Sequence, residues 1–178
     1  MRKKIFIAAA LIAVVLGAYI IAGGDKTQET VKQTAPDIKQ LVNNYSSGKL
    51  NAKSASITSD ELTVTADNND KTTYSLPKNE FFVSIAPYVN KTHPCATHSL
   101  TGCQGEMANE KFNVTITDRD GKVVIKDELQ SFDNGFIDFW LPRDQTFHVT
   151  IEHGGKSSES EISTFEDDNT CISTMQLT

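Results

Sequence analysis

The residues with the clearest chemical potential lie in one short stretch of the chain. Between His93 and Met107 the sequence places two thiols, two imidazoles, a carboxylate and a thioether, whereas the rest of the chain holds only one other cysteine, Cys171. Soft metal ions accept thiolate, imidazole and thioether donors, and thiols also exchange electrons by closing into disulfides. The stretch therefore indicates a metal-binding site, a thiol redox site, or both.

The spacing of the cysteines narrows the chemistry. Seven residues separate Cys95 from Cys103, so the pair matches neither the closely spaced cysteines of structural zinc sites nor the C-x-x-C of thioredoxin-type active sites. Zinc is therefore the weaker candidate. Monovalent copper accepts a few soft ligands without a rigid geometry, so Cys95, Cys103 and Cys171 could form a thiolate set. His93 and His98 could add nitrogen donors.

A structural disulfide is the main alternative use of these cysteines. Exported proteins meet oxidising surroundings, in which two cysteines of one loop can bridge. Because the chain has three cysteines, one thiol must stay free, bridge a second chain in a homodimer, or serve some chemistry. The same thiols could also reduce divalent copper while they close into a disulfide. Met107 fits a core position better than a ligand position.

Length and charge exclude some classes of partner. The chain has 178 residues, 38% of them hydrophobic, which is ordinary for a folded protein. Its formal net charge is -6, so it lacks the basic surface that neutralises phosphates. We therefore expect no nucleic-acid partner.

Residues 1–24 are typical of an export segment. A basic head, Arg2-Lys3-Lys4, precedes an apolar run over 5–22, which small residues follow. The run is long for a signal peptide and close to the length that spans a bilayer, so cleavage and retention as an N-terminal membrane anchor both stay open. We expect an exported protein, periplasmic or at the cell surface, that touches the membrane only through residues 1–24.

The elements that position the cysteines and histidines begin with a small α+β domain, expected over residues 25–90 after a polar tether. Apolar residues at helical spacing predict one amphipathic helix over 36–45. Two-residue alternation over 62–66 and 72–76 predicts a hairpin, and 81–86 adds a more buried strand. A helix on a small antiparallel sheet follows from this order.

Beyond residue 90 the pattern becomes one of short strands with Gly- and Asp-rich turns. Regular spacing of such strands points to a β-sandwich, so we expect a β-rich metal-binding domain over residues 91–178 and an α+β protein as a whole. The predicted strands are 112–116, 123–125, 135–141, 147–151, 158–164 and 171–177.

Three parts of the sequence together carry a family resemblance: the run 93–106, the pair Gly135-Phe136 followed by 139–143, and a last cysteine at Cys171. They resemble the CueP family of exported copper-resistance proteins. The resemblance implies a two-domain copper-binding protein outside the cytoplasm. Its copper ligands would lie at the matching positions, which are Cys95, Cys103, Cys171, His98 and His93.

The resemblance also implies a metallochaperone that reduces copper and passes it to a recipient such as a periplasmic superoxide dismutase. Cys103 and Cys171 would form the redox or ligand pair, with Cys95 as a third thiolate and His98 completing the site. Reduction by thiols is stoichiometric, so the protein would not be an enzyme unless an external reductant, such as a thiol-disulfide oxidoreductase, reopened the disulfide. The long apolar run over 5–22 departs from the family and suggests a membrane-held version, which puts the dismutase in doubt.

Two other functions use the same residues differently. A surface interaction module, stapled by a disulfide, would bind protein or glycan and leave one thiol free. A protein thiol oxidoreductase would form mixed disulfides, although the absence of C-x-x-C from the sequence weighs against it.

Overall fold

The computed structural model describes residues 37–178, and the predicted export segment and tether lie outside them. Helix α2 spans Ile38–Ser46. It begins there because the Asp37 carboxylate accepts hydrogen bonds from the backbone N–H groups of Lys39 and Gln40, which no helical carbonyl reaches. The helical spacing predicted an element at this place, and the structure confirms it. Within the described residues, no helix is long and apolar enough to cross a bilayer.

Helix α2 and a small antiparallel sheet share one hydrophobic core. The sheet has the strand order β3-β2-β1-β5. Val42 of the helix packs in one cluster with Ile57 and Leu62 of the sheet, and the alternation along β2 buries every second side chain. The predicted hairpin is therefore confirmed as β2 and β3. The strands span Ser54–Ile57 (β1), Glu61–Thr65 (β2), Lys71–Ser75 (β3) and His98–Ser99 (β5).

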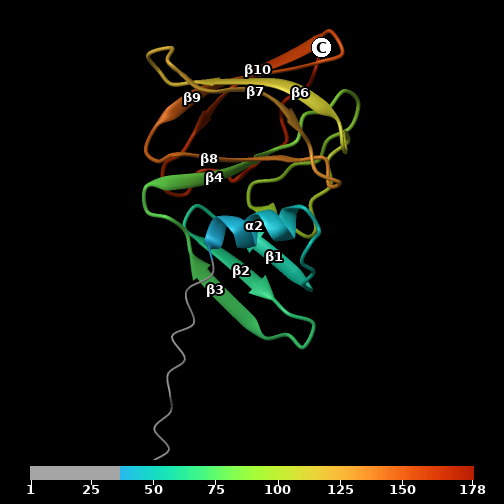
Figure 1. Cartoon of the computed structure of the whole chain (residues 1–178), viewed down its shortest axis with the longest axis vertical. Coiled ribbons are helices and arrows are strands. Elements are labelled where there is room, and N and C mark those ends of the chain that lie inside the picture. Colours follow the sequence, from blue (N-terminus) through green and yellow to red (C-terminus); the bar gives the residue numbers. More distant parts are fainter. Residues whose placement is uncertain (1–36) are drawn as a thin grey trace, which may run out of the picture. The chain divides into compact units, whose positions relative to one another are not determined.

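A second antiparallel sheet contains only strands that follow residue 90. Its order is β10-β9-β6-β7 (Figure 1). Alternate residues of β6 and β9 are buried, as expected for a sheet with one face on a core. The strands span Lys111–Thr117 (β6), Val123–Gln130 (β7), Thr146–His153 (β9) and Lys156–Ser163 (β10).

The third sheet lies between two cores and contains one parallel pair. Strand β4, Glu80–Ile85, pairs antiparallel with β8, Ile137–Pro142, and parallel with β11, Cys171–Ile172. Phe81 and Val83 of β4 pack in the large core with β6 and β9, whereas the alternate residue Phe82 packs in the core of the small sheet. Burial on both faces explains the continuous apolar run in β4.

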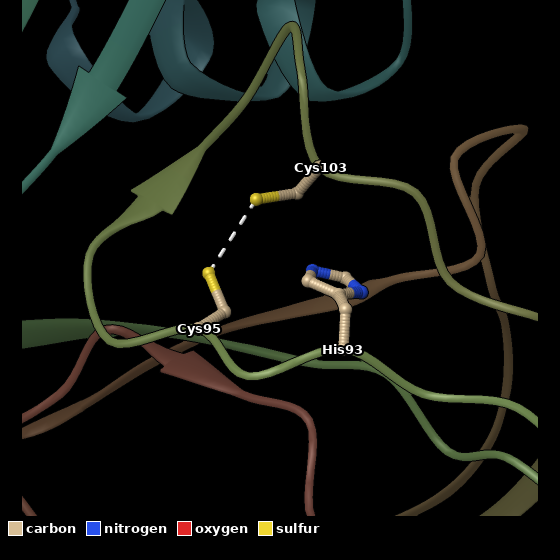
Figure 2. A group of neighbouring side chains, drawn as sticks. All are labelled: His93, Cys95 and Cys103. Carbon is tan, nitrogen blue, oxygen red and sulfur yellow. Dashed lines mark hydrogen bonds between the residues drawn. The ribbon is translucent and has the colours of Figure 1, made fainter.

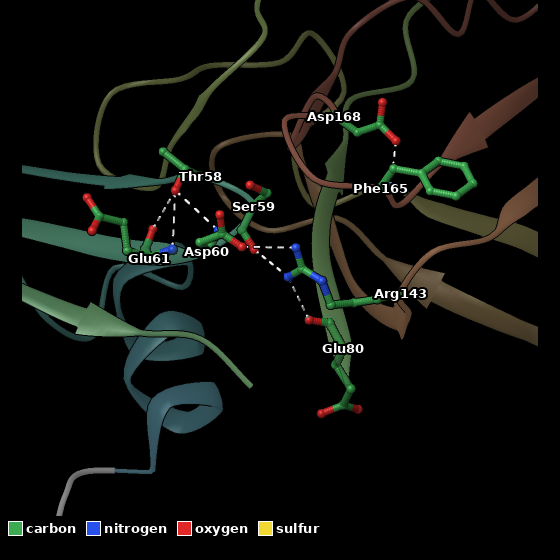
Figure 3. Close-up of polar contacts among 8 residues, drawn as sticks. All are labelled: Thr58, Ser59, Asp60, Glu61, Glu80, Arg143, Phe165 and Asp168. Carbon is green, nitrogen blue, oxygen red and sulfur yellow. Dashed lines mark hydrogen bonds and ion pairs between the residues drawn. The ribbon is translucent and has the colours of Figure 1, made fainter. Parts of the chain in front are cut away.

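Arg143 forms hydrogen bonds that connect the small sheet to the third sheet. Its guanidinium donates from Nη1 to the Ser59 carbonyl at 2.7 Å and from Nη2 to the Asp60 carboxylate at 3.0 Å (Figure 3). Its Nη1 also reaches the carbonyl of Glu80, the first residue of β4, at 3.5 Å. The turn between β1 and β2 is therefore bound to the start of β4.

Some predicted strands pair differently from the expectation. The strand predicted over 81–86 as part of the N-terminal domain is β4, which joins β8 and β11 rather than the small sheet. The strand predicted over 171–177 is wrong beyond Ile172, because the chain forms only an isolated bridge, between Tyr88 and Gln176, after that point. One short helix and three mostly antiparallel sheets agree with the predicted α+β class, although the described chain is largely β. The domain boundary near residue 90 stays a prediction.

Candidate metal centre

All five predicted ligands lie in two overlapping groups. His93, Cys95 and Cys103 form the first group, which we call the outer triad (Figure 2). His98, Cys103 and Cys171 form the second, the inner triad. Within each triad the nitrogen and sulfur atoms lie within 4.8 Å of one another. Cys103 therefore belongs to both triads, while Cys95 belongs to the outer one and Cys171 to the inner one.

Cys103 is held by a tight turn that follows strand β5. The backbone N–H groups of Gly102 and Cys103 both donate to the Ser99 carbonyl, at 3.2 and 3.0 Å. The N–H of Ser99 in turn donates to the Cys103 sulfur at 3.4 Å. The turn is anchored to the small sheet because the N–H of Leu100 donates to the Ala55 carbonyl. The Cys103 sulfur consequently has a fixed position beside β5.

The inner triad is joined by backbone pairing between distant segments. Cys171 lies in β11 and donates its N–H to the Ala96 carbonyl at 3.0 Å. His98 lies in β5 and donates its N–H to the Thr170 hydroxyl at 3.0 Å, and that hydroxyl donates to the Ile57 carbonyl at 2.7 Å. These bonds bring the last cysteine next to the Cys/His run, although 68 positions separate Cys171 from Cys103.

His93 and Cys95 of the outer triad lie on irregular backbone between β4 and β5. The Ser173 hydroxyl donates to the His93 carbonyl at 2.6 Å, and the two thiol sulfurs of Cys95 and Cys103 are 3.5 Å apart. Nearby, the Glu106 carboxylate accepts hydrogen bonds from the N–H groups of Asn90 and Val89, and these donors lower the pKa of Glu106. Glu106 therefore acts as a clamp on the loop that carries His93 and Cys95.

The two triads differ in exposure. His98 is 0% and Cys171 1% exposed, whereas His93, Cys95 and Cys103 are half-buried. Neither ring nitrogen of His98 has a hydrogen-bond partner among the described residues. A buried imidazole without partners costs about 1–3 kcal/mol for each unsatisfied group. This orphaned ring next to two sulfurs fits a ligand that awaits a soft metal ion.

The electrostatics of the thiols favour one thiolate, on Cys103. A hydrogen bond from the Cys171 thiol lowers the pKa of Cys103, and the hydrogen bond from the N–H of Ser99 lowers it further. The hydrogen bond to Cys103 raises the pKa of Cys171, and burial adds to this shift. Burial also raises the pKa of Cys95. The proton is therefore held on Cys171 and the negative charge on Cys103, which is the residue shared by both triads.

Sequence reasoning missed two residues beside the inner triad. Phe136 is fully buried and its ring contacts both imidazoles, with centroid distances of 4.5 Å to His98 and 6.4 Å to His93. Asp138 pairs across β8 and β4 with Ser84, which pairs with Cys171. The signal for Asp138 was available, because a carboxylate within the apolar strand 136–141 requires a buried partner.

Asp138 finds its partners in two hydroxyl groups. Ser84 donates to one carboxylate oxygen at 2.6 Å, and Ser46 at the end of α2 donates to the other at 2.5 Å. Burial raises the pKa of Asp138 above its ordinary value of 3.8, while the two serine donors oppose that shift. Met107, in contrast, packs against the large core, as its core interpretation predicted.

The description of the family that matches the chain names copper, an ion that this set of soft donors suits. The family described as "Periplasmic copper-binding protein CueP" matches residues 37–176. Among solved structures, the chain is similar to one described as "Crystal Structure of S.CueP", with 38% sequence identity, a TM-score of 0.76, and coverage of 82% of this chain and 91% of that chain. No curated protein matches the sequence. The resemblance found in the sequence is thus confirmed, and the chain belongs to the CueP family of periplasmic copper-binding proteins.

Proposed function

We propose that this protein is an extracytoplasmic metallochaperone that holds copper as Cu(I) through Cys95, Cys103 and Cys171, assisted by His98 and His93. The observation that carries the proposal is the convergence of these five side chains in two triads that share Cys103. Thiolates and imidazoles are soft donors, which suit Cu(I) better than they suit hard cations. Each triad supplies three such donors, and all three cysteines carry free thiols.

The same thiols can instead reduce Cu(II), and the pair that is oxidised in this step can hold copper again only after its disulfide has been reduced. Two Cu(II) ions each take one electron from a thiol pair, which gives two Cu(I) ions, one disulfide and two protons. The sulfurs of Cys95 and Cys103 are 3.5 Å apart, and a disulfide requires about 2.05 Å, so a small movement of the loop closes the bond. The sulfurs of Cys103 and Cys171 lie within 4.8 Å. Reduction stays stoichiometric unless a thiol-disulfide oxidoreductase restores the thiols.

The proposal includes the layout of the chain. Residues 1–24 direct export and either leave as a signal peptide or stay as a membrane anchor, so the copper site works in the periplasm or at the cell surface. An α+β domain over 25–90 precedes a β-sandwich-like domain over 91–178. The large core supports a sandwich, because it draws side chains from both the β4-β8-β11 sheet and the β6-β7-β9-β10 sheet, although β4 itself comes from the 25–90 segment. A recipient metalloenzyme, such as a superoxide dismutase, would take the copper.

The test is a titration of the reduced, anaerobic protein with Cu(I) in competition with a chromophoric chelator. We expect one tightly bound Cu(I) per chain in the wild type. The variants Cys95→Ser, Cys103→Ser and Cys171→Ser remove one sulfur each and keep the size of the side chain. Cys103→Ser should lose the site, since Cys103 belongs to both triads.

Control variants test whether any loss is specific to sulfur. Met107→Leu leaves both triads intact and should bind like the wild type, because Met107 packs in the core. Weak binding that none of the three cysteine variants changes would refute the copper site. The cysteines would then serve as a structural staple, and the interaction module would become the better function.

A further inference from the structure

The two triads face different surroundings. A surface pocket of about 460 Å³ is lined by His93 of the outer triad together with Gln104 and Glu106. No residue of the inner triad except the shared Cys103 is half-exposed, since His98 and Cys171 are buried. An ion that arrives from solvent therefore meets His93, Cys95 and Cys103 first. It reaches the buried His98 and Cys171 after these half-buried side chains, since both Cys95 and Cys103 pack against Cys171.

The two triads also differ in rigidity. His98 and Cys171 lie in paired strands, β5 and β11, and the Thr170 hydroxyl joins the segments that carry them. His93 and Cys95 lie outside any strand, and a hydrogen bond from Ser173 fixes the carbonyl of His93. Side chains on paired strands hold a metal in a fixed geometry, while loop side chains can follow an ion as it moves. The outer triad is suited to capture and the inner triad to retention.

The fully buried Phe136 ring lies against both imidazoles, at centroid distances of 4.5 Å from His98 and 6.4 Å from His93. The unpartnered ring nitrogens of His98 show, independently, that the inner triad lacks a ligand that its burial demands.

We propose that the two triads are successive binding sites, which we call stations, for one copper ion. Cys103 stays bound to the ion throughout this transfer, which we call the relay. This inference rests on the proposed copper function. Cu(I) first binds His93, Cys95 and Cys103, and then exchanges ligands. The bond from copper to the Cys95 sulfur breaks, the bond to the Cys171 sulfur forms, and the proton that leaves Cys171 goes to Cys95. His98 replaces His93, and copper stays Cu(I) in both stations.

The decisive experiment separates the rate of capture from the strength of retention. The full-length reduced protein is mixed anaerobically with a chromophoric Cu(I)–chelator complex, and the loss of chelator colour gives the uptake rate and the equilibrium affinity. Cys95→Ser and Cys171→Ser form a matched pair, because each replaces one thiol by a hydroxyl in one triad.

The relay predicts opposite effects for the matched pair. Cys95→Ser should slow uptake about tenfold and leave the affinity within about threefold of the wild type, because the inner triad is intact. Cys171→Ser should keep fast uptake and lose about 100-fold or more in affinity, because copper stays in the outer triad. Equal losses of affinity in both variants would overturn the relay in favour of one site with three thiolates. An unchanged uptake rate in Cys95→Ser would overturn it as well.

A second measurement needs no variant and therefore does not depend on the folding of Cys171→Ser. In long-range proton–nitrogen spectra of the loaded wild type, the ring nitrogens of His98 should shift and those of His93 should not. Shifted His93 nitrogens with unshifted His98 nitrogens would overturn the inner station. Failure of the wild type to compete for Cu(I) at all would refute the proposed function itself, which is a different result from failure of the relay.

Discussion

Cys103 is the side chain on which the chemistry of this site converges. It receives hydrogen bonds from the Cys171 thiol and from the Ser99 N–H, and its sulfur lies 3.5 Å from that of Cys95. A thiolate is the form of cysteine that binds metals and attacks disulfides. The hydrogen bonds therefore prepare one sulfur for copper while its two neighbours keep their protons.

The lowered pKa of Cys103 predicts selective alkylation. At about pH 6, where ordinary cysteines are protonated, iodoacetamide should modify Cys103 faster than Cys95, and the buried Cys171 last. Mass spectrometry of peptides after short exposures measures the three rates. In denaturant the hydrogen bonds are lost, so the three cysteines should react alike. Faster modification of Cys95 than of Cys103 in the folded protein would contradict the assignment of the thiolate.

The raised pKa of Asp138 predicts that the stability of the folded protein depends on pH. Its pKa is raised in the folded state, so the folded protein holds a proton that the unfolded chain releases above about pH 3.8. Its contribution to the free energy of unfolding is complete below that pH and is lost as pH rises through the folded pKa. Asp138→Asn carries no such proton, so the wild type should lose stability relative to this variant as pH increases.

Chemical denaturation of both proteins at several pH values measures the difference. The exposed Asp133 supplies a matched control, Asp133→Asn, for the general loss of one carboxylate. A wild-type stability that stays constant relative to Asp138→Asn at all pH values, or that increases relative to it as pH rises, would show that the folded pKa of Asp138 is not raised.

Among the elements, the segment after Cys103 depends on a close approach of two backbones. Gly135 has a φ of +79°, and a Cβ atom there would lie 2.7 Å from the Gly105 carbonyl oxygen. The N–H of Gly105 also donates to the Asn134 carbonyl at 2.7 Å. Both glycines are therefore required to keep the 103–105 segment against Phe136 and the start of strand β8.

Gly135→Ala should consequently lower the free energy of unfolding by more than the strain in φ alone would. We expect a loss of about 2–4 kcal/mol in the free energy of unfolding, because a backbone oxygen must move as well. Gly121 is the matched control, since its φ is +78° and a Cβ atom added there would meet no other atom within 4 Å. Gly121→Ala should cost only about 1 kcal/mol. Denaturant unfolding of the two variants checks this, and equal costs would contradict the steric argument.

At the scale of the whole molecule, the site joins segments that lie far apart in the sequence. Strand β5 brings His98 to the small sheet, and β11 brings Cys171 to β4 in the third sheet. Thr170, the residue before Cys171, links β11 to the small sheet. Its hydroxyl accepts a hydrogen bond from the His98 N–H and donates one to the Ile57 carbonyl. A ligand that bridges His98, Cys103 and Cys171 therefore stabilises contacts between sheets.

Copper loading should accordingly raise the melting temperature. A ligand at about 100 times its Kd adds about 2.7 kcal/mol to the free energy of unfolding when it does not bind the unfolded chain. For a chain of this length that corresponds to about 5–10 °C. Differential scanning fluorimetry of the reduced protein, with and without Cu(I), measures the shift. Cys103→Ser should show little of it, and an equal shift in that variant would place the copper elsewhere.

The sequence by itself determined the donor types, the family and most of the local elements. The density of thiols and imidazoles over 93–107 predicted a soft-metal site, and the run 93–106 with Gly135-Phe136 identified the CueP family. Periodicity located the helix, the hairpin and most strands, because it reports which side chains are buried. It also predicted that β4 is more buried than its neighbours, and both of its faces do pack in cores.

Only the tertiary structure decided which of these residues meet. Periodicity does not report the partner of a strand, so the pairing of β4 with β8 and β11 could not be read from it. That parallel pairing places Cys171 beside Cys103, and the short strand β5 places His98 beside both. The separation into a half-exposed outer triad and a buried inner triad follows from packing over distances of many residues along the chain, which local sequence does not encode.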